Sequence, residues 1–169
     1  MKTIIVVIPP KPVSGLTTCL AAWEGRLTAS VATAGVRSSR EKKPSVPPSA
    51  HQELDSLAKL RFDGIVLMDG FDGQGYPHHP HLLIDQLQAY DRKKKLVAAV
   101  GRSCLLLAQA GLLVGKPATT ATVPEVLEAL RRYGAIYQAS PIVRSGWLIT
   151  ADGSDMTAFA NAITQMLLA

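Results

Sequence analysis

The sequence predicts an α/β protein with a doubly wound, mostly parallel sheet that carries helices on both faces. Strand-like and helix-like segments alternate along the whole chain, a pattern typical of this class. Two strand-like runs, residues 2–8 and 96–100, are almost entirely apolar, as expected for parallel strands buried on both faces. Hydrophobic residues make up 47% of the 169 residues and aromatic residues only 5%. Small aliphatic side chains must therefore build the core.

The strands are predicted from apolar runs and from alternation with a period of two. In chain order, we expect them at residues 2–8, 26–33, 62–70, 96–100 and 116–121. The run at 141–150 contains two β-like segments around Ser145 and Gly146, which predicts a β-hairpin near the C-terminus. The fold class is thus a flavodoxin-like sheet extended by one small hairpin.

The helices are predicted from apolar residues spaced three and four apart. In chain order, we expect them at residues 14–25, 51–60, 80–95, 123–134 and 155–169, with one more starting within three residues of Gly101. Lys and Arg residues at the end of 80–95 complement the helix dipole, and Pro124 suits the first turn of its helix. The prolines of residues 34–50 make helix unfavourable there and predict a mobile loop.

Size and composition exclude several classes of protein. A chain of 169 residues predicts a single domain over residues 1–169. Much of the net charge of +5 comes from residues 37–43 and 91–95, which we interpret as solvated loops rather than a nucleic-acid surface. Cys19 and Cys104 lack CxxC spacing, so neither a disulfide framework nor a metal knuckle is indicated. The apolar start is too short for a signal peptide or a membrane span, so we expect a cytoplasmic protein.

Ligands bind such sheets beyond the carboxyl ends of the strands, and the segments there also carry a family pattern. They read "FDGIVLMDG" (62–70), "VAAVGRSCLLLAQAGLLVGKPATT" (97–120) and "PIVRSGWLITADGSDMTAFANAITQML" (141–167). In order and spacing they resemble the ThiJ/PfpI family, within the class I glutamine-amidotransferase-like fold. The resemblance covers most of Asp63 to Leu168. It implies a homodimer and, for catalytic members, small carbonyl, amide or nitrile-like substrates.

The resemblance also shows departures from the family pattern. The family's nucleophilic Cys, at the sharp turn or elbow between a strand and a helix, falls on Gly101. Residues 9–15, "PPKPVSG", contain no carboxylate, and Ala121 stands where many members have a His. Of the family's Gly-Gly pair only Gly70 remains, with Asp69 before it. Glycine keeps the backbone angles of an elbow but removes the thiol. We therefore expect a divergent member without the usual catalytic triad.

Cys104 and Asp69 are the candidates for relocated chemistry. Cys104 lies in the first turn of the predicted helix, where the helix dipole can lower the pKa of a thiol. The favoured alternative is that Cys104 is a small buried residue that packs the helix onto the sheet. Asp69 and Asp72 could hold a cation or act as an acid/base pair, but the neighbouring glycines indicate turn residues first.

Two further residues of the elbow have binding or structural interpretations. Ser103 half fits a G-x-S-x-G motif, and we expect it instead to cap the helix with its hydroxyl. Arg102 beside free backbone N–H groups could hold a small anion. Equally, Arg102 could pair with Asp69, with Asp72 or with an acidic residue of another subunit.

The histidines and tryptophans do not indicate a cofactor site. His78, His79 and His81 cluster in sequence, but adjacent histidines seldom converge on one metal ion, so we interpret them as solvated and predict no metal. Trp23 and Trp147 are expected to pack in the core or at a subunit contact. No motif for an organic cofactor is found.

These observations lead to two functional hypotheses. The first is a non-catalytic protein with a binding, regulatory or scaffold role, whose pocket is formed by Gly70, Gly101, Arg102 and Ser103 and holds a small anion. The second is a hydrolase- or lyase-type enzyme that uses Cys104 or Asp69. The absence of the elbow Cys, the carboxylate and the His favours the first. In either case we expect a homodimer without nucleic-acid or membrane partners.

Overall fold

A computed structural model describes residues 1–9, 13–33, 51–53, 62–71 and 80–169. The strands are β1 (Thr3–Ile8), β2 (Thr28–Thr33), β3 (His51–Glu53), β4 (Gly64–Leu67), β5 (Leu96–Val100), β6 (Pro117–Ala118), β7 (Ile136–Tyr137), β8 (Ile142–Ser145) and β9 (Leu148–Ala151). The helices are α1 (Leu16–Trp23), α3 (Pro80–Arg92), α4 (Cys104–Gln109), α5 (Pro124–Arg132) and α6 (Met156–Leu168). Their alternation confirms the predicted fold class.

Seven of the described strands form one sheet in the order β3-β2-β1-β4-β5-β9-β8. All neighbours are parallel except β8 and β9, which form an antiparallel pair. That pair is the predicted hairpin, but its turn lies one residue later than expected. Ser145 is paired with Leu148, so Gly146 and Trp147, rather than Ser145 and Gly146, form the two-residue turn. Gly146 has a φ of 60°, as the first position of the favoured hairpin turn requires. The parallel strands therefore bring their carboxyl ends to one edge of the sheet.

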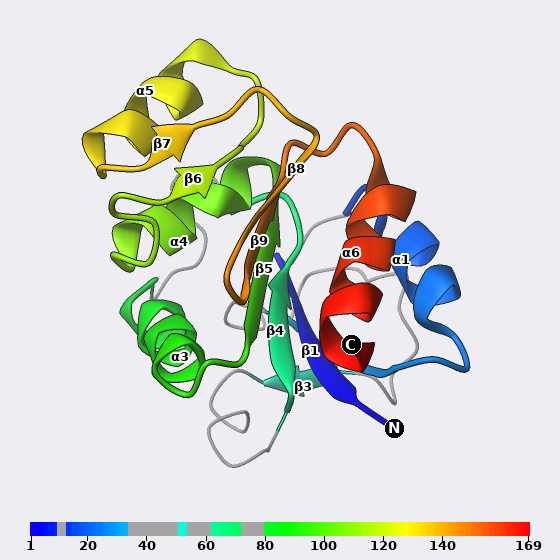
Figure 1. The fold of residues 1–169 in the computed structure, drawn as a ribbon. Coiled ribbons are helices and arrows are strands. Elements are labelled where there is room, and N and C mark those ends of the chain that lie inside the picture. The colour runs from blue at the N-terminus through cyan, green and yellow to red at the C-terminus, as the bar shows by residue number, and fades with distance from the viewer. Residues whose placement is uncertain (10–12, 34–50, 54–61, 72–79) are drawn as a thin grey trace, which may run out of the picture.

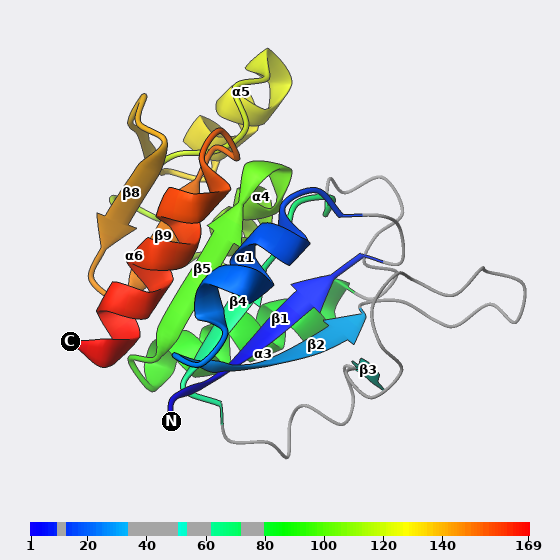
Figure 2. The same cartoon turned by 90° about the vertical axis from the view of Figure 1, so that its right-hand side faces the viewer.

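Helices cover both faces of this sheet (Figure 1). On one face, α1 and α6 pack side by side, as Figure 2 shows. On the other face, α3 and α4 pack against β4 and β5. Each face has its own apolar cluster, because alternate residues of a strand point to opposite faces. In β1, for example, Ile5 and Val7 belong to one cluster, whereas Ile4 and Val6 belong to the other.

Three elements differ from the sequence prediction. The helix expected at residues 51–60 is wrong at its start, because His51–Glu53 forms strand β3, parallel to β2. Residues 54–60 lie outside the described ranges. The edge of β2 offers unpaired N–H and C=O groups, and pairing with them outweighs a weak helical pattern. The strand expected at 116–121 is limited to Pro117–Ala118, and it pairs with the unpredicted β7 in a separate two-stranded sheet.

Candidate functional site

The tight turn predicted after β5 is present at Gly101. The strand ends at Val100, a 3-10 turn covers Gly101–Ser103, and α4 begins at Cys104. Gly101 has a φ of 66°, in the left-handed region that residues with a side chain rarely adopt. The backbone therefore makes the sharp strand-to-helix elbow for which glycine is suited.

The carboxylate of Asp69 lies directly against this elbow. Asp69 follows β4, the neighbouring strand, and its Oδ1 accepts a hydrogen bond of 3.1 Å from the backbone N–H of Arg102. A Cβ atom added to Gly101 would lie 2.6 Å from Oδ1 of Asp69, and closer still to Cγ and Oδ2. The Asp69 carboxylate thus fills the space that a side chain at position 101 would need.

The opposite side of the elbow is held by the segment after β6. The hydroxyl of Thr120 donates a hydrogen bond of 2.9 Å to the carbonyl oxygen of Gly101, and the backbone N–H of Ala121 donates one of 3.3 Å to the same oxygen. Thr120 was not among the residues predicted for the site. The sequence feature that could have identified it is the polar pair Thr119 and Thr120, which follows β6. The structure buries both threonines.

Ser103 connects the elbow to the end of β4 and does not cap α4. Its hydroxyl is fully buried, donates to the carbonyl oxygen of Met68 at 2.5 Å, and accepts from the backbone N–H of Phe71 at 3.3 Å. The expected helix cap is wrong, because Ser103 itself has helical angles and makes no side-chain capping bond. A capping residue needs extended backbone angles to turn its hydroxyl toward the first turn.

Cys104 is buried beneath the elbow. Its Sγ lies 3.5 Å from two carbonyl oxygens, those of Ala99 and Ala151. Burial raises the pKa of the Cys104 thiol to about 12, and the negative charge of Asp69 adds to the increase. Because the thiolate is the reactive form, this thiol is unsuited to nucleophilic attack at neutral pH. Its surroundings fit the packing interpretation.

Arg102 and Gly70 complete the candidate set. The side chain of Arg102 is partly exposed, and none of the ion pairs among the described residues involves it. Gly70, between Asp69 and Phe71, has a φ of 119°, so the loop after β4 also relies on a glycine conformation. The six predicted site residues, Asp69, Gly70, Gly101, Arg102, Ser103 and Cys104, are therefore gathered at the carboxyl ends of β4 and β5.

Other predicted features lie away from this cluster. Asp72, His78 and His79 are outside the described residues. His81 is in the first turn of α3, and within the described part of the chain no three His, Cys, Asp or Glu residues are grouped to hold a metal ion. Trp23 is buried, and its indole N–H donates to the carbonyl oxygen of Ala160 at 3.1 Å. No helix in the described ranges is long and apolar enough to cross a membrane.

Comparisons with known proteins agree with this architecture. A model of the DJ-1/PfpI family matches residues 15–166. An uncharacterized protein of Methanocaldococcus jannaschii is 37% identical over 91 residues, which span 54% of this chain but only 44% of that protein. This chain therefore matches less than half of that relative's length.

Solved structures share the fold at low sequence identity. A ThiJ/PfpI domain protein from Brachyspira murdochii superposes with a TM-score of 0.81 and 18% identity, over 98% of this chain and 96% of the other. DJ-1beta of Drosophila melanogaster gives a TM-score of 0.77 and 24% identity, over 98% and 90%. These likenesses concern the fold, and the match to the family model spans most of the sequence. The chain belongs to the DJ-1/PfpI family.

Proposed function

We propose that this chain is a non-catalytic member of the DJ-1/PfpI family with a binding, regulatory or scaffold role. One observation carries the proposal: at the elbow, where the family resemblance places a nucleophilic Cys, Gly101 has no side chain and the Asp69 carboxylate fills the space. A carboxylate held there by the Arg102 amide also blocks the approach of a substrate carbonyl to that amide. The elbow geometry is kept without a thiol.

Neither cysteine offers an alternative nucleophile. Cys19 and Cys104 are both buried, and burial raises the pKa of each thiol to about 12. A thiol with this pKa is almost entirely protonated at neutral pH. The relocated enzyme chemistry considered for Cys104 therefore lacks support.

The ligand proposed for this site is a small anion that contacts the guanidinium of Arg102. The chain already supplies one anion here, because Asp69 accepts from the Arg102 backbone N–H. An anion from solution must displace this carboxylate or bind beside it, through the guanidinium alone. Removing the carboxylate in Asp69→Ala should therefore strengthen binding of acetate, the smallest stable carboxylate probe with an apolar group.

The decisive test rebuilds the missing thiol. In Gly101→Cys the new side chain overlaps with Asp69, whereas Asp69→Gly/Gly101→Cys has room for it. If the turn is the family's nucleophile elbow, the double variant gains a thiol that reacts with iodoacetamide at neutral pH far faster than the two buried cysteines of the wild-type chain. An unreactive new cysteine, in a folded double variant, would show that the turn is not such an elbow.

A parallel assay tests whether the wild-type chain is catalytic. The substrates are a small aldehyde, an amide and a nitrile, the classes that the resemblance suggests. We expect no turnover by the wild-type protein. Turnover that disappears in Asp69→Asn, while the fold is retained, would overturn the proposal and make Asp69 a catalytic carboxylate.

A homodimer in the cytoplasm remains part of the proposal. Support for self-association comes from three exposed apolar side chains near the α5–β7 turn, Val114, Tyr133 and Ile136, which are 62%, 42% and 56% exposed. Apolar side chains that gather on a surface often mark a contact with another protein. Light scattering of the purified chain at several concentrations measures the mass of the particle in solution. A constant mass equal to that of one chain would contradict the proposed dimer.

A further inference from the structure

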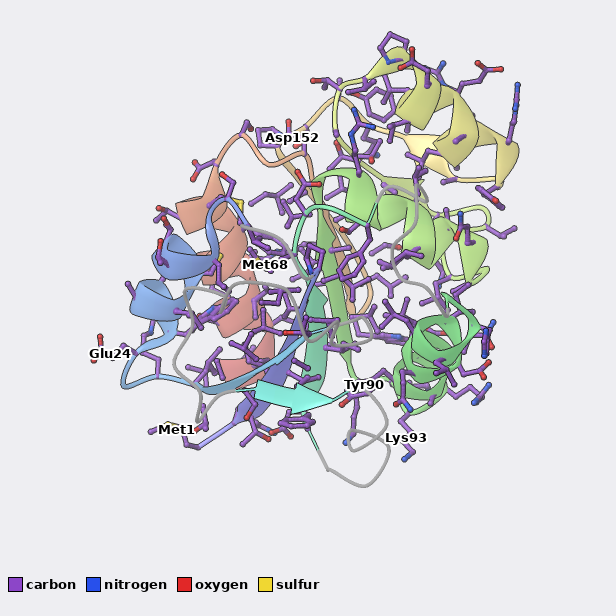
Figure 3. The ribbon with its side chains drawn as sticks, turned by 180° about the vertical axis from the view of Figure 1, so that it is seen from behind. Met1, Glu24, Met68, Tyr90, Lys93 and Asp152 are labelled. Atoms are coloured by element: carbon purple, nitrogen blue, oxygen red, sulfur yellow. The ribbon has the colours of Figure 1, made fainter. Side chains whose placement is uncertain are left out.

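A hollow lies at the opposite edge of the sheet from the elbow, where β1 and β5 begin. It has a volume of about 480 Å³, and its lining includes Lys2, Lys94, Lys95, Leu96, Trp147 and Met166. Figure 3 shows Asp152 at one end of the molecule and Met1, Tyr90 and Lys93 at the other. The hollow is at the end marked by Met1, so it is separate from the elbow. Its volume is in the range of small-molecule sites.

The charged side chains that line the hollow are mainly positive. Three lysines line it together with the Asp63 carboxylate and Ala169, whose backbone ends in a carboxylate. Lys2 Nζ is 3.6 Å from Asp63 Oδ1, and Lys95 Nζ donates to the carbonyl oxygen of Phe62 at 2.6 Å. Each ammonium group has three N–H donors, so these contacts leave donors on every lysine. The hollow can therefore offer positive N–H donors to an anionic group.

The lining of the hollow also includes apolar side chains from both faces of the sheet. The indole N–H of Trp147 donates to Oδ1 of Asp91 at 2.8 Å, which fixes the orientation of the ring. Leu96 is buried, and Met166 from α6 packs beside it in the same apolar cluster. The ammonium of Lys94 lies 5.9 Å from the centre of the Trp147 ring. Positive donors and an apolar surface thus adjoin each other.

The backbone of Lys94 has a strained conformation. Of the non-glycine residues in the described ranges, Lys94 alone has a positive φ, 53°. The N–H groups of Lys94 and Lys95 donate to the carbonyl oxygens of Asp91 and Tyr90, which is the Schellman arrangement that ends a helix. Glycine is the usual residue at this left-handed position. A lysine there gives up stability and places a positive side chain in the hollow, and such strain is concentrated at functional sites.

We propose that this hollow binds a phosphate monoester whose organic part is apolar. The lysines contact the phosphate as point charges, and the organic group lies against Trp147 and Met166. The inference concerns a site at the opposite edge of the sheet from the elbow and does not depend on the function proposed for Asp69 and Gly101.

The test uses phenyl phosphate as the probe and Trp147 fluorescence as the readout. Trp23→Phe leaves Trp147 as the single tryptophan, and calorimetry on the wild-type chain gives the binding constant without that substitution. Inorganic phosphate supplies the charge without the ring, and benzyl alcohol supplies the ring without the charge. We expect saturable binding of phenyl phosphate and much weaker binding of both comparison compounds.

A matched pair of variants locates the binding. Lys94→Gly removes a lining ammonium and relieves the positive φ, so it should weaken phenyl phosphate roughly two- to fivefold while raising the urea midpoint of unfolding. Lys93→Ala removes the neighbouring, exposed charge, which does not line the hollow, and should leave the affinity unchanged. The proposal fails if phenyl phosphate does not saturate, if inorganic phosphate binds equally well, or if both variants weaken binding alike.

Discussion

The Asp69 carboxylate occupies the position where a side chain on Gly101 would begin. The added Cβ would lie 2.6 Å from Oδ1 of Asp69, well inside van der Waals contact, and the same oxygen accepts from the Arg102 amide. Side-chain volume that the family resemblance places at position 101 is thus supplied from position 69, on the neighbouring strand end. The two positions are coupled, and a change at one alters what the other tolerates.

Gly101→Ala should destabilise the fold by about 2–4 kcal/mol. The positive φ alone costs about 1–3 kcal/mol for a residue with a side chain, and overlap with Asp69 adds to it. Gly25→Ala is the matched control, because Gly25 has a φ of 71° but nothing within 4 Å of an added Cβ. Urea unfolding of both variants isolates the steric part. Equal losses in the two variants would show that Asp69 does not crowd position 101.

Both thiols should react slowly with iodoacetamide at neutral pH. A pKa of about 12 for Cys19 and Cys104 leaves on the order of one thiolate in 100,000 molecules at pH 7. The raised pKa stabilises the folded state below the unfolded-state value near 9, and this contribution is lost as the pH rises from about 9 toward 12. Alkylation followed by mass spectrometry measures the rates. A rapid reaction at Cys104 in the native protein would contradict this environment.

Ser103→Ala should cost about 1–3 kcal/mol. The substitution leaves the Phe71 N–H and the Met68 carbonyl oxygen in a buried place without the hydroxyl that joins them, and an unsatisfied buried polar group carries this penalty. Ser154→Ala, at an exposed serine that bonds Asp152, should change the free energy of unfolding by less than about 0.5 kcal/mol. Thermal unfolding compares the two. A neutral Ser103→Ala would mean that water or a shifted backbone replaces the hydroxyl.

Asp63 should stabilise the folded state at neutral pH, and this contribution should be lost in acid. The backbone N–H of Thr3 donates to Asp63 Oδ2 at 2.8 Å and lowers the pKa of that carboxyl below its ordinary value of 3.8, with a further contribution from Lys2. The stabilisation is complete above the unfolded-state pKa and is lost as the pH falls through the lower folded-state pKa. Its size is below about 1 kcal/mol, because solvent screens a partly exposed carboxylate.

Asp63→Asn isolates this contribution. The difference in unfolding free energy between the variant and the wild-type chain should be largest near pH 6 and should shrink as the pH approaches 3. Asp85→Asn, on the helix α3, supplies a control for the loss of one negative charge. A difference that stays constant between pH 6 and 3 would exclude titration of Asp63 as its source.

The strands and helices that were predicted well are those with strong local patterns. β1 and β5 are apolar runs, because a parallel strand is buried on both faces. The hairpin at residues 142–151 was found from its turn chemistry. In contrast, β3 and β7 have three and two residues, too few to show a period. They form because a neighbouring strand offers unpaired backbone groups, and no local pattern records that partner.

For the site, the sequence placed Asp69, Gly70 and the 101–103 turn at one sheet edge, because parallel strands bring their carboxyl ends together. From the sequence, Ser103 was expected to cap the helix, since capping is the usual local role of a serine before a helix. The buried hydrogen bonds that Ser103 makes with Met68 and Phe71, and the close approach of Asp69 to Gly101, join residues more than thirty positions apart. Such contacts exist once β4 and β5 pair, and their distances follow from three-dimensional packing rather than from any local pattern.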